Sequence, residues 1–179
     1  DLWQVHDLRG TGEWEELTAP GGALEAFEEA RQSGKARFIG ITGHYDPAPL
    51  MNALERFDFD TILLALNPTD PHLTPFATGL LPLANRKGMG VIAMKLACRG
   101  RIFRGTGLRT MSDSMRWVLS HPVSTVIIGV DTVTQLEENV RIATAFQPMD
   151  QTELTRVAAL TEDYAEEAAF FKRGGVGWG

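Results

Sequence analysis

The sequence predicts an α/β fold built on a parallel sheet. Short apolar runs alternate along the chain with amphipathic helical segments. The apolar runs show no alternation of polar and apolar residues, which is typical of strands buried on both faces. The 179 residues are 44% hydrophobic and 22% charged, a composition that suits one globular unit with a sizeable core. A barrel and an open, doubly wound sheet both satisfy this alternation.

Five strands and six helices are expected, and they follow one another in order. The expected strands are the apolar runs Leu2–His6, Ala36–Thr42, Thr61–Asn67, Gly90–Leu96 and Ser124–Val130. The expected helices are Gly22–Ser33, Pro49–Phe57, Pro75–Arg86, Met111–Leu119, Thr132–Ala143 and a last helix from Asp150 to about Phe171. Gly34 and Gly88 should end the first and third of these helices. The Gly-rich tail after Phe171 is expected to be a flexible terminus.

The stretch from Met111 to Ala143 is expected to form a helix, a buried strand, a tight turn at Gly129 and another helix. Thr132 and Gln135 have the spacing of a capping box at the start of the second helix. Its buried stripe should consist of Val133, Leu136, Val140 and Ala143. Such a turn offers backbone N–H groups and the positive end of a helix dipole, which suit a phosphate, although an ordinary capped βα turn has the same pattern.

Composition excludes several classes of protein. The net charge of −6, without a cluster of Lys or Arg, argues against a nucleic-acid surface. No apolar run is long enough to cross a bilayer. Cys98 is the only cysteine, so the chain can form neither an internal disulfide nor a cysteine-based zinc site, which fits the cytoplasm. No pair of residues at helical spacing predicts a metal site, and no nucleophile elbow or Walker loop is present.

Ligands of parallel α/β proteins bind at the carboxyl ends of the strands. In this sequence those ends carry His6, Thr42, Gly43, His44, Asn67, Met94, Lys95, Gly129 and Asp131. An imidazole at such a place can donate a hydrogen bond to a substrate carbonyl or transfer a proton, although a strand-end histidine can also be purely structural. Lys95 could form a Schiff base if burial lowered its pKa, or it could be a solvated or ion-paired lysine.

Five segments in order resemble the aldo-keto reductases. Residues 1–6 (DLWQVH) are similar to the strand that ends in the catalytic histidine of that family, and residues 34–44 (GKARFIGITGH) to its "GK.R.iG.Sn." segment. Residues 64–68 (LALNP) resemble its "Q.eyNP" segment, and residues 88–96 (GMGVIAMKL) its seventh barrel strand. Residues 115–143 resemble its last strand and cofactor-binding helix. The resemblance implies a (β/α)8 barrel of TIM type that reduces aldehydes or ketones with NADP or NAD as the hydride carrier.

The resemblance also implies roles for individual residues. His6 would be the catalytic hydrogen-bond donor to the carbonyl, and Met94 would pack on the nicotinamide. The other expected cofactor-binding residues are Thr42, Gly43, Asn67, Lys95, Gly129, Asp131, Thr132, Gln135, Glu138 and Asn139. Gly43 and Leu63 replace an asparagine and a glutamine of the family, which favours a second reading as a non-catalytic nucleotide-binding or assembly fragment. Met94 and Lys95 are neighbours on one strand, so both should not face inward.

The resemblance implies that the chain holds only the fourth to eighth strands. Residues 1–146 would form this part of the barrel, and residues 147–179 would form a helix and a tail packed on it. The family's catalytic tyrosine, lysine and aspartate belong to the first three units, so the chain alone is expected to be inactive. Five strands cannot close the barrel, and we expect the chain to need a missing N-terminal segment or to associate with itself.

Overall fold

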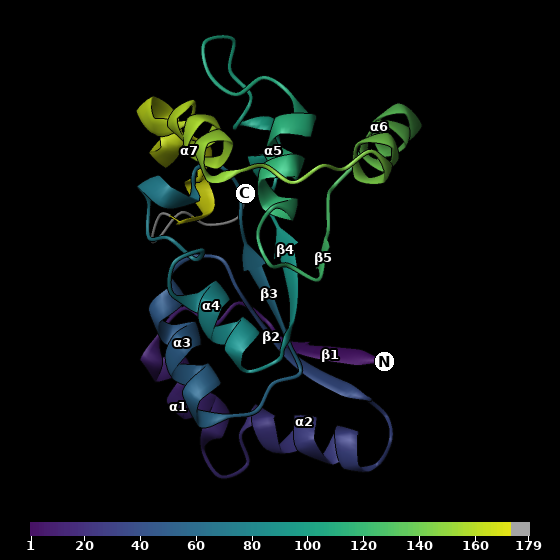
Figure 1. Cartoon of the computed structure of the whole chain (residues 1–179). Coiled ribbons are helices and arrows are strands. Elements are labelled where there is room, and N and C mark those ends of the chain that lie inside the picture. Colours follow the sequence, from purple (N-terminus) through teal and green to yellow (C-terminus); the bar gives the residue numbers. More distant parts are fainter. Residues whose placement is uncertain (173–179) are drawn as a thin grey trace.

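The computed structural model describes residues 1–172 as one parallel sheet with helices on its covered face (Figure 1). The strands are β1 (Leu2–Val5), β2 (Phe38–Gly43), β3 (Thr61–Ala65), β4 (Gly90–Met94) and β5 (Thr125–Val126). The α-helices are α1 (Thr11–Thr18), α2 (Ala23–Gln32), α3 (Pro47–Arg56), α4 (Leu80–Arg86), α5 (Met111–Leu119), α6 (Val133–Thr144), α7 (Gln151–Ala159) and α8 (Ala165–Ala168). Short 3-10 helices span Asp70–His72, Cys98–Gly100, Glu162–Tyr164 and Phe170–Lys172.

The strand order distinguishes between the two architectures that the sequence leaves open. The order is β1-β2-β3-β4-β5, and each neighbouring pair is parallel. A doubly wound sheet reverses its order at a switch point, whereas a barrel adds each strand beside the previous one. The expected fold class is therefore confirmed: five parallel strands in the succession of a (β/α)8 barrel.

The two faces of the sheet differ in burial. Ile62 and Leu64 of β3 and Val91 and Ala93 of β4 are buried. Helices α3 and α4 lie on one side of the sheet (Figure 1). The other face carries the half-buried residues Thr61, Leu63, Gly90, Ile92 and Met94, and we call it the open face. Because side chains alternate along a strand, the open face corresponds to the lumen of a closed barrel.

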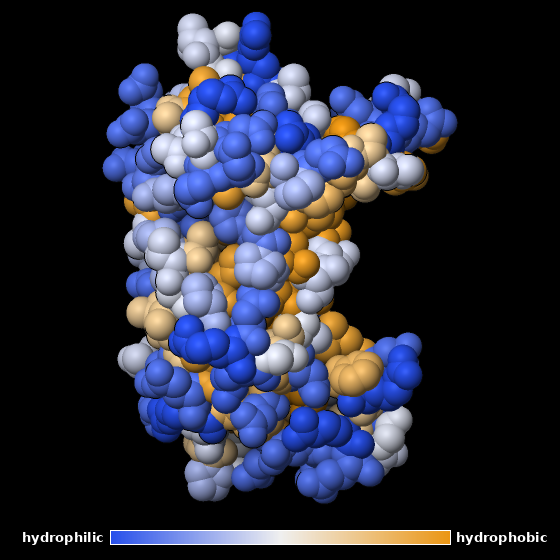
Figure 2. Space-filling model, viewed as in Figure 1, coloured by the Kyte–Doolittle hydropathy of each residue, from blue (hydrophilic) through white to orange (hydrophobic). Residues whose placement is uncertain are grey.

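Apolar residues are exposed around the open side of the molecule. Large exposed side chains lie on β1 and β2, after β5 and on α6: Leu2, Trp3, Phe38, Ile127, Val130, Val133, Leu136 and Val140. Figure 2 shows a hollow between α6 and the N-terminal end of β1, with hydrophobic residues on its walls. Among the described residues, no second strand pairs with β1 or with β5. Such unpaired edges and apolar walls are typical of a barrel that lacks part of its circumference.

Local sequence accounts for most helix ends. Asp46 caps α3, and Thr110 caps α5, each by accepting a hydrogen bond from a backbone N–H of the first turn. Asp150 forms a capping box with Glu153 at the start of α7. Gly34 and Gly88, which follow α2 and α4, have φ angles of 74° and 70°, as a residue just past a helix end requires.

Several sequence expectations about single elements are wrong. Helix α1 was not expected, because Gly10 and Gly12 flank its first residue and its apolar stripe is short. The last helix breaks after Ala159 into α8 and two 3-10 turns. The strand expected at Ser124–Val130 has only two residues, and no residue of that run is buried. Gly129 has no positive φ, and a Cβ there would meet nothing within 4 Å, so its turn does not require glycine.

The predicted buried stripe of α6 is also wrong. The structure buries no residue of α6, and Val133 is 71% exposed. Ala143 of the same stripe is exposed as well. No element among residues 1–172 packs over that face, whereas Ile142 on another side of the helix contacts the core. Helix α6 is therefore amphipathic, but no described residue covers its apolar side.

Candidate active site

The carboxyl ends of the parallel strands form one rim, and the predicted residues lie along it. His6 follows β1, Thr42 and Gly43 end β2, and Asn67 and Lys95 follow β3 and β4. His6 is exposed, whereas Thr42 and Asn67 are buried. The rim therefore brings one accessible imidazole together with polar groups from three further strands.

Thr42 and Gly43 contribute differently to the rim. The Thr42 hydroxyl accepts a hydrogen bond from the Asp7 N–H at 2.8 Å, and its own proton can be donated to another acceptor. Gly43 pairs with Leu64 on the covered face, and a Cβ there would lie 2.7 Å from Leu50 Cδ1. A larger side chain at this position would point toward α3, so Gly43 can offer a ligand only its backbone.

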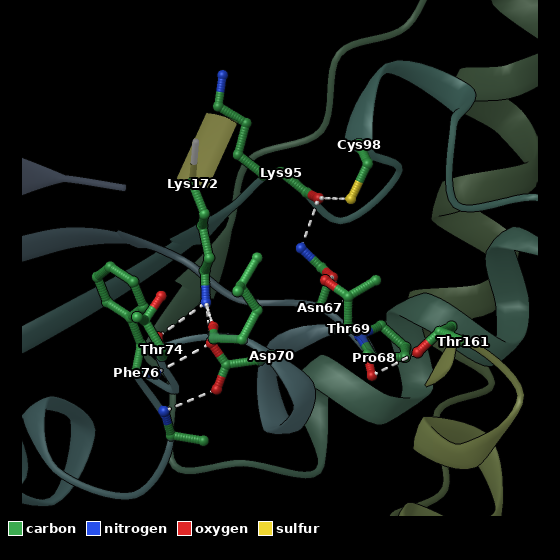
Figure 3. Close-up of polar contacts among 12 residues, drawn as sticks. Asn67, Pro68, Thr69, Asp70, Thr74, Phe76, Lys95, Cys98, Thr161 and Lys172 are labelled. Carbon is green, nitrogen blue, oxygen red and sulfur yellow. Dashed lines mark hydrogen bonds and ion pairs between the residues drawn. The ribbon is translucent and has the colours of Figure 1, made fainter. Parts of the chain in front are cut away.

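Asn67 links the ends of β3 and β4 to each other (Figure 3). Its Nδ2 donates to the Lys95 carbonyl at 3.2 Å. Its Oδ1 accepts from the Thr69 N–H at 3.0 Å and from the Thr69 hydroxyl at 2.7 Å. Asn67 is 1% exposed. The amide is thus engaged within the protein, which is a structural role and fits poorly with the expected contact to a cofactor.

Met94 and Lys95 need not point to opposite faces of the sheet, because only Met94 belongs to strand β4. Met94 lies on the open face, beside Ala65 of β3. Lys95 has left the strand, with a φ angle of 66°, so strand alternation no longer determines its direction. In Figure 3 the Lys95 side chain extends away from Asn67. Burial and the neighbouring Arg99 cation lower the pKa of Lys95, while Asp7 opposes this shift.

The start of α6 has the predicted capping box. Gln135 Oε1 accepts from the N–H groups of Asp131 at 2.7 Å and Thr132 at 3.2 Å, and the Thr132 hydroxyl accepts from the Gln135 N–H. These amides are therefore occupied, and the first-turn N–H groups that the helix cannot satisfy are those of Val133 and Thr134. Glu138 is exposed and Asn139 is half-buried further along α6.

The C-terminal segment covers part of the rim. The Phe171 ring lies edge-on to His44, with centroids 6.3 Å apart, and Lys95 Nζ lies 5.9 Å from its centroid. The basic loop before α5 contacts the same segment, because Arg101 lies over the Phe170 ring and Arg104 pairs with Glu167. The sequence did not single out Phe171, since an aromatic residue near a chain end carries no positional signal.

Asp7 is a further rim residue that the sequence reasoning missed. It is 7% exposed and lies between the chain neighbours His6 and Leu8. Its carboxylate pairs with Arg9 and lies 3.4 Å from His44 Nδ1. The only signal in the sequence was an acidic residue directly after a strand-end histidine. Within residues 1–172 no group of three or more His, Cys, Asp or Glu side chains could hold a metal ion.

Comparison with known proteins agrees with this geometry. L-galactose dehydrogenase of Arabidopsis thaliana is 26% identical over 192 residues, which cover 90% of this chain and 59% of that protein. The holo form of the aldo-keto reductase AKR11C1 from Bacillus halodurans superposes with a TM-score of 0.69 at 24% identity, over 89% of this chain and 60% of that one. The glycerol dehydrogenase AKR11B4 from Gluconobacter oxydans gives a TM-score of 0.66 at 18% identity, over 92% and 59%. No protein-family model matches the chain.

The resemblance to the aldo-keto reductases is thus confirmed, and the chain has the fold of a C-terminal portion of their barrel. The chain spans about 59% of the length of the curated relative that it matches. None of the helices among residues 1–172 is long and apolar enough to span a membrane.

Proposed function

We propose that this chain supplies the fourth to eighth βα units of an NAD(P)H-dependent reductase of aldehydes and ketones, of aldo-keto reductase type. The observation that carries the proposal is the common rim of His6, Thr42 and Lys95 on a barrel-type sheet. The relatives with this fold include oxidoreductases that act on small molecules, L-galactose dehydrogenase and glycerol dehydrogenase. A cytoplasmic location is part of the proposal, because the single cysteine cannot form an internal disulfide.

Each residue in the proposed reaction has a definite physical task. The exposed His6 imidazole donates a hydrogen bond to the substrate carbonyl and polarises it. When bound, the nicotinamide would supply the hydride, and the proton for the resulting alkoxide would come from the tyrosine that the resemblance assigns to the first three βα units. The Thr42 hydroxyl can donate to the carboxamide of the nicotinamide, and Met94 on the open face offers a soft thioether to the ring. The first-turn amides of α6 can bind a phosphate.

The residues fit the cofactor only in part. The free proton of the Thr42 hydroxyl, Met94 on the open face and the first-turn amides of α6 support the proposal, whereas the Asn67 amide is engaged by Thr69 and Lys95. Gly43 offers no side chain. These two positions support the alternative of a non-catalytic nucleotide-binding or assembly fragment. Quenching of tryptophan fluorescence by NADPH or NADH together with carbonyl reduction would favour the reductase. Quenching without carbonyl reduction would favour the nucleotide-binding fragment, and absence of binding would favour the assembly fragment.

The open side of the molecule supports a proposed partner. We propose that either further βα units or a second copy of the chain covers β1, β5 and the apolar side of α6. Residues 1–146 would be the barrel part, and residues 147–179 would pack on it. Two hydrogen bonds support this packing: Thr161 Oγ1 donates to the Pro68 carbonyl, and Trp117 Nε1 donates to the Leu154 carbonyl.

The test compares this chain with the longest polypeptide in which it occurs. Oxidation of NADPH and NADH is followed with an aromatic aldehyde as substrate. We expect turnover by the longer polypeptide and none by the 179-residue chain alone. His6→Ala should lower kcat by more than about tenfold while the nucleotide Kd changes less than about threefold. Full activity of the chain alone, or of the His6 variant, would refute the proposal.

The charged residues near α6 lead to a proposal about cofactor choice. NADPH carries an additional phosphate, which favours nearby Lys or Arg. Here Asp131 precedes α6, Glu137 and Glu138 follow its first turn, and Arg141 is the nearest cation in sequence. We therefore expect weak discrimination between the two cofactors. A preference for NADPH above about 100-fold in Kd, near 2.7 kcal/mol, would contradict this expectation.

A second candidate reaction rests on Lys95. Burial and Arg99 lower its pKa, which favours the neutral amine that a Schiff base requires. Borohydride trapping with a carbonyl substrate, followed by mass measurement of the Lys95 peptide, separates this lyase reaction from the reductase. A reduced adduct at Lys95 would favour the lyase.

A further inference from the structure

Asp7 adopts a backbone conformation that few residues tolerate. Its φ angle is 57°, in the left-handed region, directly after β1. Aspartate enters this region more readily than most residues because its short side chain can form local hydrogen bonds. The turn at Asp7 points its carboxylate toward the ends of β2 and β4, since it reaches His44 and interacts with Lys95.

Two hydrogen bonds from the backbone of this turn connect β1 to β2 beyond their last paired residues. Regular pairing ends at Val5 and Ile41. The Asp7 N–H then donates to the Thr42 hydroxyl at 2.8 Å, and the Leu8 N–H donates to the Thr42 carbonyl at 3.0 Å. His6 lies between Val5 and Asp7, which are both hydrogen-bonded to β2. Its position relative to Thr42 is therefore determined by the Asp7 turn.

The carboxylate of Asp7 pairs with Arg9 and faces the His44 imidazole. One oxygen accepts from Arg9 Nε at 2.6 Å, and the other lies 3.4 Å from His44 Nδ1. The side chains of Asp7 and His44 are 5% and 7% exposed, so solvent screens their interaction little. Burial lowers the pKa of His44; Asp7 opposes this shift, and Lys95, Arg9 and His6 add to it. Phe171 packs on the same imidazole.

We propose that Asp7 is a positioning residue that holds His6 in register with Thr42. The proposal rests on the function proposed above, in which His6 contacts the carbonyl and Thr42 the nicotinamide. Asp7 itself contacts neither the substrate nor the cofactor. Its backbone N–H sets the distance between the two strand ends, and its carboxylate maintains the left-handed turn by pairing with Arg9 and packing against His44.

The activity test uses the longest polypeptide that contains this chain. Asparagine also tolerates the left-handed conformation, so Asp7→Asn removes only the charge. Alanine tolerates this conformation less well, so Asp7→Ala removes the charge and also disfavours the turn. We expect kcat to fall about tenfold or more in both variants, because small displacements of a catalytic group are costly, while KM for the nucleotide changes less than about threefold. Asp58→Asn is the matched control, since Asp58 has a 96% exposed side chain paired with Lys87. Wild-type kcat in both Asp7 variants would overturn the proposal.

A second measurement does not depend on reductase activity. In the 179-residue chain, Thr42→Val removes the acceptor of the Asp7 N–H, and hydrogen exchange of that amide should accelerate at least about tenfold. Asp7→Asn should lower the pKa of His44 measured by NMR, because it removes the group that raises it. Unchanged exchange and an unchanged His44 titration would overturn the proposal. If both change but the longer polypeptide reduces no carbonyl, the positioning contact stands and the proposed function fails.

Discussion

Lys172 and Asp70 form an ion pair of 2.9 Å in which each side chain is 1% exposed, although 102 residues separate them in the chain (Figure 3). Lys172 Nζ also donates to the carbonyls of Leu73 and Thr74, and the Asp70 carboxylate accepts from the N–H groups of Phe76 and Ala77. Every polar group of the pair thus has a partner. The expectation that the tail from Lys172 onward is flexible is wrong for Lys172, and residues 173–179 lie outside the described part.

This pair predicts a large effect for Lys172→Met. The substitution leaves the Asp70 carboxylate buried beside two backbone donors but without a cation. We expect the free energy of unfolding to fall by about 3 kcal/mol, the lower end of the range for broken buried pairs. Lys87→Met is the control, because its partner Asp58 is exposed, and it should cost less than about 1 kcal/mol. Urea unfolding followed by tryptophan fluorescence measures both, and equal losses would contradict the prediction.

Local patterns in the sequence predicted the order of the strands correctly, although they missed helix α1. The apolar runs that became β2, β3 and β4 lack alternation, and Gly34 and Gly88 mark the true helix ends. Burial of α6 could not be predicted, because an amphipathic pattern shows which side of a helix is apolar but not whether anything covers it. The strand pattern identified the rim positions, and the resemblance implied their roles. It could not reveal that Thr69 and Lys95 engage the Asn67 amide, because that depends on loop geometry.

Acidification should destabilise the chain through His121. Burial lowers the pKa of His121 below its usual 6.5, and the Trp117 carbonyl partly opposes this. The folded state therefore holds the imidazole neutral, and the unfolded state binds the proton first as the pH falls. The contribution of His121 to the free energy of unfolding is fully present above about pH 7. It declines as the pH falls through 6.5 toward the lower pKa of the folded state, with a slope of at most about 1.4 kcal/mol per pH unit for one proton.

Chemical denaturation at pH 7.5 and pH 5.8 measures this decline. His44 contributes in the same direction, because burial also lowers its pKa. His121→Gln should therefore reduce the difference between the two pH values without abolishing it. An unchanged difference in the variant would show that His121 is not responsible.

Cys98 should be unreactive in the folded chain. Burial raises the pKa of its thiol to about 12, and the side chain is fully buried. The thiolate is the reactive form, so its fraction at pH 8 is about a thousandfold below that of an ordinary cysteine. We expect a thiol reagent to label Cys98 only at the rate of unfolding, with rapid labelling in denaturant. Rapid labelling without denaturant would contradict this prediction.

The exposed apolar side of α6 should drive self-association of the isolated chain. Val133, Leu136 and Val140 are 71%, 51% and 56% exposed and lie on one side of the helix. A contiguous apolar surface of this kind favours association in water. Leu136→Glu combined with Val140→Lys should shift sedimentation toward the monomer, since it places charges on that surface. Leu160→Ser is the control, because this residue is also exposed but lies apart on the segment after α7. If wild type and the double variant sediment alike, α6 is not the associating surface, and the unpaired edges of β1 and β5 become the next surfaces to alter.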